Sequence, residues 1–427
     1  MNAAPALPVL CQHAPHEVVV WRQGQAVSAA QLHAQAHALA RVLPRTRYAI
    51  NLCESRRNFL AAFLATAQRE QVSLLPSSRA PLAVREIQDH YPDHHVLTDE
   101  LADGAISDSV MRSPLTIAES GAVAIVFTSG TTGRPTPHEK DWRTLLATAR
   151  LAHERFLPDA RGFNVVATVP AQHMYGFETT VTLILLSASA VSDARPLFPA
   201  DVAAELAAVP APRVLITTPA HLRACVASGA SFPALELIIS ATAPLDRELA
   251  ADAERRWNTR VFEIYGCTEA GSMASRRTTQ SEHWFAYPGA WVEAHQAGAT
   301  YHGAHLPEPV PLPDFLELES PQTFRLVGRD ADLVKVAGKR ASLAELTQRL
   351  LTIRGVHDAI VFVPHPDGRP AALVVASGIA RDEILAALAA QLDPVLVPRP
   401  LLLVERLPRD ALGKIPRAAL LGAIGES

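Results

Sequence analysis

The stretch AVAIVFTSGTTGRPTPHEK, residues 122–140, is the starting point for interpreting the whole chain. Its first six residues, Ala122–Phe127, are apolar and predict a buried strand. The next six are all hydroxylic or glycine, namely Thr128, Ser129, Gly130, Thr131, Thr132 and Gly133. Glycine lets backbone N–H groups converge on an anion, and hydroxyls add uncharged donors. Arg134 and Lys140 add positive charge, so the stretch predicts a loop that binds polyphosphate.

Two other interpretations compete for this loop. A Ser/Thr/Gly loop can simply be flexible and solvated, and composition alone leaves that alternative open. The P-loop of NTPases is excluded, because it needs four residues between its glycines and then Gly-Lys-Ser/Thr. Here two residues separate Gly130 from Gly133, and Arg-Pro-Thr follows. Any nucleotide at this loop is therefore held in another way.

Length and composition indicate an ordinary globular protein. The 427 residues are enough for about two or three domains, and the 48% hydrophobic content is typical of a packed core. A net charge of −4 argues against broad binding to nucleic acid or anionic membrane. The four cysteines form no CxxC pair, which favours a reducing compartment. No signal-peptide pattern or long apolar run is seen, so we expect a cytoplasmic protein without membrane insertion.

Predicted helices and strands take turns along the first part of the chain. Residues 28–43 and 58–68 have helical periodicity, and residues 48–52 and 72–75 are strand-like. This alternation predicts an α/β layered domain. Pro81–His90 and Asp246–Trp257 are further predicted helices. Further predicted strands are His95–Thr98, Asn164–Pro170, Arg213–Thr217, Leu235–Ser240, Arg260–Ile264, Phe315–Glu319 and Thr323–Val327.

Charge and glycine interrupt the apolar pattern at residues 328–332, where we place a domain boundary. Beyond it the sequence restarts as a compact α+β unit. Its predicted elements are strands Leu333–Val336, Ala359–Val363, Ala371–Ser377 and Pro400–Val404, and helices Leu343–Leu351 and Arg381–Leu392. We therefore expect a large domain over residues 1–327 and a small domain over residues 333–427.

Two segments that follow predicted strands carry candidate ligand contacts. His173 lies in the segment AQHMYGFE, just past a strand end, where α/β sheets bind ligands. A lone histidine is, however, more often structural. Ala241-Thr242-Ala243-Pro244 is a small-residue turn with no bulky side chain to block a flat ligand.

The segment Tyr265-Gly266-Cys267-Thr268-Glu269 combines several groups suited to a nucleotide. Tyr265 offers a ring face for a base, Thr268 a hydroxyl for phosphate, and Glu269 a carboxylate for Mg²⁺. The pentapeptide alone equally suits a strand-terminal turn with a solvated glutamate. Lys414, between Gly413 and Pro416, taken alone favours a solvated surface charge.

The order of six motifs is far more specific than any one of them. TSGTTGRP, QHMYG, a small-residue turn ending in Ala-Pro-Leu, YGCTE, GRDADLVKVAGKR and LGKIPR follow one another. The series, covering the chain from about residue 16, closely resembles the adenylate-forming superfamily. That superfamily includes acyl- and aryl-CoA synthetases, adenylation domains of peptide synthetases, and luciferases. The resemblance implies its fold, a large layered α/β domain and a small mobile α+β lid domain.

The resemblance also implies residue roles. Nucleotide contacts are Thr128, Ser129, Gly130, Thr131, Thr132, Ala241, Thr242, Ala243, Tyr265, Gly266, Asp314 and Arg329, with Tyr265 against adenine and Asp314 and Arg329 at the ribose. Acid contacts are His173, Tyr175, Gly176 and Gly266. Catalytic residues are Lys414, Thr268, Glu269 and His173, with Glu269 the Mg²⁺ ligand. Asp330 and Ala331 lie in the hinge, residues 328–332, and Gly338 lines the thiol channel.

The implied reaction uses MgATP to turn a carboxylic acid into an acyl-adenylate, and then transfers the acyl group to a phosphopantetheine thiol of coenzyme A or an acyl carrier protein.

Two departures weaken the match: Thr136 occupies the usual lysine position, which Lys140 would have to replace, and Ala331 occupies a usual hinge position. The continuation PTPHEKDW and the short chain resemble the aryl- or acyl-carrier-protein ligases of aryl-polyene (xanthomonadin-type) pigment pathways. This implies 4-hydroxybenzoate or 3-hydroxybenzoate as the acid. The alternatives are a short- or medium-chain fatty acyl-CoA synthetase and a non-catalytic module that binds adenylate or docks a carrier protein.

Overall fold

The computed structural model describes residues 10–106, 116, 121–128, 135–156, 162–295, 298–312, 314–329, 333–336, 339–365, 368–392, 394–409 and 415–425. For residues 328, 329, 333–336, 339–342, 344 and 345 it describes the backbone alone.

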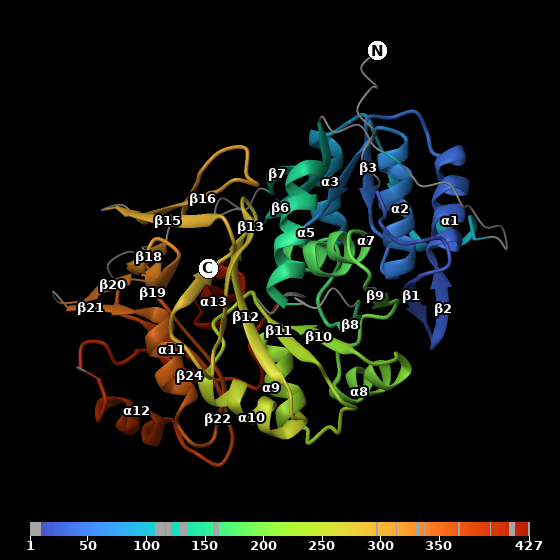
Figure 1. Ribbon diagram of the computed structural model, residues 1–427. Coiled ribbons are helices and arrows are strands. Elements are labelled where there is room, and N and C mark those ends of the chain that lie inside the picture. Colours follow the sequence, from blue (N-terminus) through green and yellow to red (C-terminus); the bar gives the residue numbers. More distant parts are fainter. Residues whose placement is uncertain are drawn as a thin grey trace.

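A five-stranded sheet in the order β5-β3-β4-β6-β7 forms the upper part of the molecule (Figure 1). Its strands are β3 (Tyr48–Asn51), β4 (Val72–Leu75), β5 (His94–Leu97), β6 (Ala122–Thr128) and β7 (Thr136–Asp141). The first four run parallel, and β7 turns back antiparallel to β6. Parallel strands must be covered on both faces, so neighbouring residues such as Leu74 and Leu75 belong to different apolar cores.

An eleven-stranded sheet in the order β18-β19-β14-β13-β12-β11-β10-β8-β9-β1-β2 spans the rest of the large unit. Its strands are β1 (Val18–Arg22), β2 (Gln25–Ser28), β8 (Asn164–Ala167), β9 (Ala190–Ser192), β10 (Arg213–Thr217), β11 (Leu237–Ser240), β12 (Arg260–Cys267), β13 (Gly271–Arg277), β14 (Trp284–Ala286), β18 (Asp314–Ser320) and β19 (Thr323–Arg329). The strands from β1 through β9, β8, β10 and β11 to β12 are parallel. From β12 onward the sheet continues antiparallel.

Helices fill the space between the two sheets and cover their outer faces. One core joins residues of both sheets, such as Val126 and Ile239, with Phe63, Trp142 and Phe177 from helices. The helices that contribute to it include α1 (Ala29–Val42), α2 (Arg56–Gln68), α4 (Asp99–Asp103), α5 (Trp142–Phe156), α6 (Met174–Phe177) and α7 (Leu183–Leu185). Helix α3 (Pro81–His90) packs on the outer face of the five-stranded sheet. Helices α8 (Pro199–Ala208), α9 (Pro219–Ala227) and α10 (Arg247–Trp257) cover the larger sheet along the lower edge of Figure 1.

Smaller sheets complete the chain. Strands β15 (Ala290–His295), β16 (Gly298–Gly303) and β17 (Val310–Leu312) form a three-stranded sheet. After β19 come a two-stranded sheet, β20 (Leu333–Val336) and β21 (Lys339–Ser342), and a three-stranded one, β22 (Val356–Phe362), β23 (Ala371–Ala376) and β24 (Leu401–Leu403). Helices α11 (Leu343–Leu351), α12 (Arg381–Ala389) and α13 (Arg417–Ala423) pack on the latter, and this C-terminal part has apolar cores of its own.

The predicted α/β class is confirmed, and the strands Val72–Leu75, Arg213–Thr217 and Leu333–Val336 have the predicted bounds. Two predicted strand bounds need correction. The strand predicted over residues 260–264 continues to Cys267, because it pairs with β13, and the one predicted over residues 164–170 ends at Ala167. Strand β7 (Thr136–Asp141) was not predicted from the sequence. Gly328 and Arg329, assigned to the hinge, end β19, and residues 330–332 lie outside the described residues.

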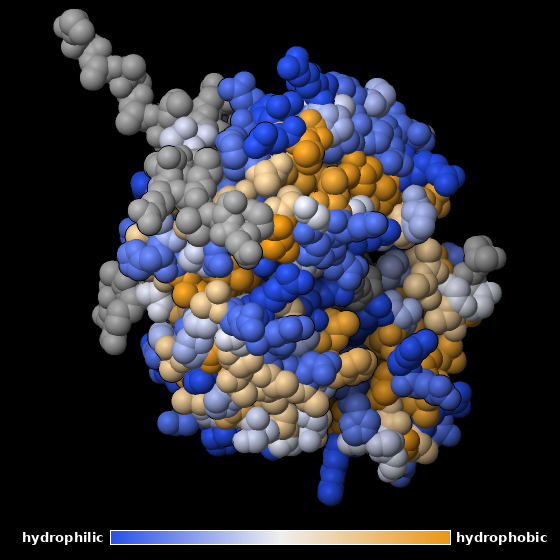
Figure 2. Space-filling model, turned by 90° about the vertical axis from the view of Figure 1, so that its right-hand side faces the viewer, coloured by the Kyte–Doolittle hydropathy of each residue, from blue (hydrophilic) through white to orange (hydrophobic). Residues whose placement is uncertain are grey.

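The face shown in Figure 2 carries separate apolar patches among hydrophilic side chains. Isolated apolar residues on a surface are normal for a globular protein and mark no particular site. None of the described helices is both long enough and apolar enough to cross a membrane.

Candidate active site

The carboxyl ends of β11 and β12 bring two predicted nucleotide segments to the same edge of the sheet. The strands are parallel neighbours, with Ser240 beside Glu263, so the turn over residues 241–243 lies next to the end of β12. Such an edge is where open α/β sheets bind ligands. Thr242 has a φ of +80°, a left-handed conformation that is unusual for a residue other than glycine. Backbone strain of this kind concentrates at functional sites.

The predicted base and ribose contacts lie together. The Tyr265 hydroxyl donates a hydrogen bond to Asp314 Oδ2 at 2.7 Å, and both side chains are buried. The Tyr265 ring also packs against Trp284 and Phe324, with centroid distances of 5.6 and 5.9 Å. Arg329 lies opposite Asp314 in the pairing of β18 with β19. Tyr265 from the YGCTE motif, Arg329 from the Gly-Arg pair, and Asp314, predicted from its spacing to that pair, therefore lie at one end of the sheet.

Gly266 stands at an irregularity in the pairing of β12 with β13. A Cβ atom at this position would lie 2.4 Å from the Gly271 carbonyl oxygen, so the two backbones can approach only because residue 266 is glycine. Thr268 and Glu269 follow in the turn that joins the two strands. The Glu269 side chain is 51% exposed, which leaves its carboxylate accessible to a ligand.

The β6–β7 hairpin meets this turn from the other sheet. Thr128 Oγ1 lies 3.2 Å from His138 Nε2, and His138 Nδ1 lies 3.7 Å from Glu269 Oε1. Lys140 Nζ donates a hydrogen bond to the Glu269 backbone carbonyl at 2.7 Å. The base of the predicted phosphate loop and the predicted Mg²⁺ ligand are thus tied together, although they come from different sheets. Sequence reasoning did not assign a role to His138.

Lys140 is only 4% exposed, and its contact is with protein rather than with open solvent. Burial lowers the pKa of its ammonium group, and the carboxylates of Glu178 and Glu269 act in the opposite direction. Burial also lowers the pKa of His138, which favours the neutral imidazole. Lys140 therefore fixes the backbone of the Glu269 turn in this structure, while the lysine position of the family is filled by the exposed Thr136.

Three of the four predicted acid contacts lie on or directly before the short helix α6, and the fourth, Gly266, lies in β12. His173 is the residue before α6, and its side chain is buried. Tyr175 donates a hydrogen bond from its hydroxyl to the Ile239 carbonyl at 2.9 Å, which holds α6 against β11. A Cβ atom at Gly176 would lie 2.0 Å from the Pro170 carbonyl oxygen, so only glycine fits there. These residues are near the nucleotide segments, because Ile239 precedes the turn over residues 241–243.

A buried carboxylate that the sequence analysis did not assign lies one residue beyond α6. Glu178 is 7% exposed and begins the π-helical segment η1 (Glu178–Thr182). Such segments are frequent at functional sites. Its carboxylate accepts hydrogen bonds from the Ser272 backbone N–H and from Ser272 Oγ, the latter at 2.6 Å. Burial raises the pKa of Glu178, while Ser272 and the charge of Lys140 oppose that shift. A charged residue within the apolar run FETTVTLILL was the signal available in the sequence.

The residues present fit a single Mg²⁺ ion bound largely by substrate. Mg²⁺ commonly takes one or two carboxylates from the protein and phosphate oxygens from the nucleotide. Glu269 offers one accessible carboxylate next to Thr128 and His138. Within the described ranges there is no group of three or more His, Cys, Asp or Glu residues that would hold a metal without such help.

Several predicted site residues cannot be placed. Ser129, Gly130, Thr131, Thr132, Asp330, Ala331, Gly338 and Lys414 lie outside the described residues. The described residues on either side of the phosphate loop are Thr128, which ends β6, and Pro135, which precedes β7.

Comparison with known proteins places this geometry in context. A model of the AMP-binding enzyme family matches residues 20–297. The 4-coumarate–CoA ligase of Halorhodospira halophila is 30% identical over 310 residues, which cover 67% of this chain and 73% of that protein. The 4-coumarate–CoA ligase of Rhodobacter capsulatus is 28% identical over 269 residues, covering 62% of this chain and 67% of that protein.

Solved structures share the fold over almost the whole chain. O-succinylbenzoate–CoA synthetase of Bacillus subtilis, in complex with AMP, superposes with a TM-score of 0.81 at 16% identity and covers 95% of this chain and 96% of that one. The anthranilate–CoA ligase AuaEII, in complex with anthranoyl-AMP, has a TM-score of 0.80 at 14% identity and covers 96% of both chains. At these identities the likeness shows the fold alone.

Proposed function

The chain belongs to the family of AMP-binding enzymes, and on this premise we propose that it joins a hydroxylated aromatic carboxylic acid to a thiol, with ATP as the activating substrate. The coarse activity is that of an AMP-forming acid–thiol ligase: an acid becomes an acyl-adenylate and then a thioester. The named acid, the acceptor and the individual roles of residues are our proposal.

The observation that carries the proposal is the meeting of the β6–β7 hairpin with the β12–β13 turn. It joins Thr128, at the base of the polyphosphate loop, to Glu269 through His138. The Tyr265–Asp314 pair lies at the same end of β12 and supplies an aromatic ring and a carboxylate for base and ribose. A nucleotide bound there spans from Tyr265 toward Thr128, with its phosphates next to Glu269.

In the first half-reaction a carboxylate oxygen of the acid attacks the α-phosphorus of ATP. The bond from that phosphorus to the bridging oxygen breaks, and pyrophosphate leaves. The chain contributes positioning and charge neutralisation: Thr128 with residues 129–132 donates to the phosphates, and Lys414 neutralises charge on the reacting oxygens. Mg²⁺, when bound by Glu269, supplies further neutralisation of the phosphate oxygens. His173 and Tyr175 orient the acid.

In the second half-reaction a thiol attacks the acyl carbonyl carbon, and AMP leaves. We propose that residues 333–427 form a small domain that turns about residues 328–332, withdraws Lys414 and opens a thiol channel along Gly338. The backbone supports this division, since β19 ends the large sheet at Arg329 and β20 starts a separate one. The acceptor is a phosphopantetheine thiol, either of an acyl carrier protein or of coenzyme A.

For the acid we propose 4-hydroxybenzoate or 3-hydroxybenzoate. The relatives named above act, by their names, on 4-coumarate, which is a hydroxylated aromatic acid. The resemblance to aryl-polyene (xanthomonadin-type) ligases rests on PTPHEKDW and the short chain. A pathway of that kind would supply an acyl carrier protein as partner.

The test is ATP–pyrophosphate exchange with a panel of benzoates, hydroxybenzoates, cinnamates and short- to medium-chain fatty acids. We expect exchange with hydroxybenzoates, and Lys414→Ala should abolish it while ATP binding stays nearly unchanged. Exchange with fatty acids alone would establish the fatty acyl alternative. Silence across the panel would favour a non-catalytic module. Full exchange by Lys414→Ala would remove that lysine from the mechanism.

A further inference from the structure

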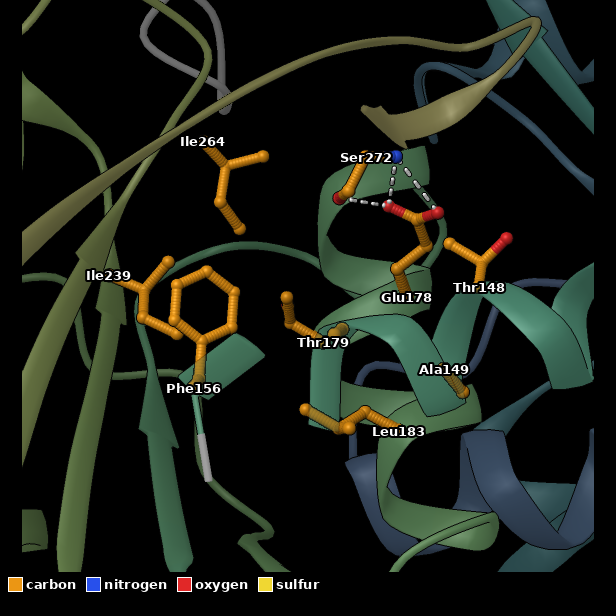
Figure 3. A pocket seen from close by; sticks show the side chains of 10 residues that line it. Thr148, Ala149, Phe156, Glu178, Thr179, Leu183, Ile239, Ile264 and Ser272 are labelled. Atoms are coloured by element: carbon orange, nitrogen blue, oxygen red, sulfur yellow. Dashed lines mark hydrogen bonds between the residues drawn. The ribbon is translucent and has the colours of Figure 1, made fainter. Parts of the chain in front are cut away.

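A cavity with one apolar wall and one polar end lies beneath the strand ends. Figure 3 shows Phe156, Ile239 and Ile264 on one side, and the Glu178 carboxylate, joined to Ser272, on the other. The empty volume, open solvent space included, is about 320 Å³. Only a small part of it admits the centre of a water molecule, so a ring enters only when the lining side chains move apart.

The cavity lies next to the segments predicted to contact the nucleotide and the acid. Ile239 is two residues before the turn at Ala241, and Ile264 directly precedes Tyr265. The other side of the cavity is η1, which continues the helix that carries His173 and Tyr175. An acid with its carboxylate at the strand ends would therefore extend its ring between these walls, toward Glu178.

The Glu178 carboxylate retains the ability to accept a further hydrogen bond. Within the described part of the chain Ser272 supplies every hydrogen bond to it, and one backbone N–H is shared between the two oxygens at 3.1 Å each. An ionised carboxylate has about four acceptor sites. Burying a charge without a full set of partners is costly, so a buried and incompletely bonded carboxylate indicates a function.

The surrounding chain is built to hold this carboxylate in place. Gly271 has a φ of +75°, and a Cβ atom there would lie 2.2 Å from Glu178 Oε1. The two threonines that line the cavity direct their hydroxyls elsewhere: Thr148 bonds the Thr144 carbonyl and Thr179 the Tyr175 carbonyl. Glu178 and Ser272 are therefore the polar groups available to a ligand, and the charged one among them is an acceptor.

We propose that Glu178 determines specificity by accepting a hydrogen bond from a hydroxyl group on the ring of the acid. The inference rests on the proposed function and names the group that selects its substrate. A flat apolar wall suits an aromatic ring, and a charged acceptor at the far end suits an O–H donor. An acid without such a donor covers the carboxylate and leaves its remaining acceptor site without a partner, which disfavours that acid.

The test compares kcat/KM of ATP–pyrophosphate exchange for hydroxybenzoates and for benzoate. We expect the wild type to prefer a hydroxybenzoate by about 100-fold or more, since sites built around a substrate hydroxyl reject its analogue strongly. Glu178→Gln should reduce that preference about tenfold or more while kcat/KM for benzoate changes little. Glu178→Asp keeps the charge but shortens the side chain by one methylene group, and we expect its preference for hydroxybenzoate to lie between those of the wild type and Glu178→Gln. If Glu178→Gln does not fold, Glu178→Asp provides the test in its place.

Glu263→Gln is the matched control. Glu263 is equally buried, and its carboxylate is bonded to Arg276 and Thr278 rather than facing the cavity. A substitution that only disturbs the structure should lower kcat/KM for hydroxybenzoate and for benzoate by the same factor. We expect this result for Glu263→Gln. An unchanged preference in Glu178→Gln would overturn the inference while leaving the proposed function intact, whereas a wild type that exchanges no aromatic acid would overturn both. Preference for aminobenzoate over hydroxybenzoate would overturn the assignment of a hydroxyl.

Discussion

Two glycines with nearly the same positive φ allow the Glu178–Ser272 cluster to be tested by stability alone. Gly271 has a φ of +75° and Gly289 a φ of +74°. A Cβ atom at Gly271 would meet Glu178 Oε1 at 2.2 Å, whereas nothing lies within 4 Å of one at Gly289. Substituting alanine at either site places a side chain at a positive φ, which costs energy at both, and only the variant at Gly271 adds a collision.

The expected magnitudes follow from these contacts. A left-handed alanine costs about 1 kcal/mol, which is the whole effect predicted for Gly289→Ala. In Gly271→Ala the Glu178 oxygen must retreat from 2.2 Å to at least 3.0 Å, because closer contacts with a Cβ atom essentially do not occur. That movement breaks a hydrogen bond between a buried carboxylate and Ser272, at about 2 kcal/mol more. We expect Gly271→Ala to lose about 3 kcal/mol in total.

The measurement is urea unfolding of both variants and the wild type, with free energies of unfolding obtained by linear extrapolation. The difference between the two variants isolates the collision. Equal losses at Gly271 and Gly289 would refute the claim that the Glu178 carboxylate is held rigidly against the β12–β13 turn.

Three further predictions concern charge at the site and in the core. Lys140→Met removes the donor to the Glu269 carbonyl and should lower the free energy of unfolding by about 2–4 kcal/mol. The control Arg85→Met, at an exposed position, should lower it by less than about 0.5 kcal/mol. Equal urea midpoints for the two variants would contradict the prediction. Glu269→Gln should raise the Mg²⁺ concentration for half-maximal pyrophosphate exchange at least about tenfold, and an unaltered Mg²⁺ requirement would remove this residue from the metal site. The free energy of unfolding should fall as the pH drops below 6.5, because burial lowers the pKa of His13 and His33 in the folded state, so that the unfolded chain binds more protons. His33→Gln should make the unfolding free energy, measured in urea at several pH values, depend less steeply on pH. An identical pH dependence in this variant would contradict the account.

The parallel strands could be predicted because burial on both faces makes them continuous apolar runs. Arg213–Thr217 and Leu237–Ser240 are strands of this kind, and their predicted bounds differ from the observed ones by at most two residues. The antiparallel strands β7 and β13 were missed, because sequences such as TPHEKD and GSMASRR carry little apolar signal. Strand β7 is mostly exposed, and the burial of β13 depends on packing against segments distant in sequence, which no local pattern encodes.

Most of the predicted nucleotide residues could be proposed because they belong to motifs that are contiguous in sequence, as Tyr265 does. Asp314 was proposed from its spacing to Gly328 and Arg329, and the structure brings its carboxylate to 2.7 Å from the Tyr265 hydroxyl. His138 and Glu178 were not assigned a site role, and for Lys140 only a positive charge near the phosphate loop was predicted. Each of the three acts through a partner more than ninety residues away, apart from the shorter link of His138 to Thr128. Long-range partners of polar side chains become visible only in three dimensions.

The tie between Lys140 and the Glu269 turn also determines when the site can exist during synthesis. The two residues are 129 positions apart, and chains generally fold from the N-terminus as they emerge from the ribosome. The strands of the upper sheet can pair once β7 has left the exit tunnel, but the opposing turn is made only much later. A nascent chain that stops before Glu269 therefore lacks the residue that His138 and Lys140 contact, and the two sheets are not yet tied together at this point.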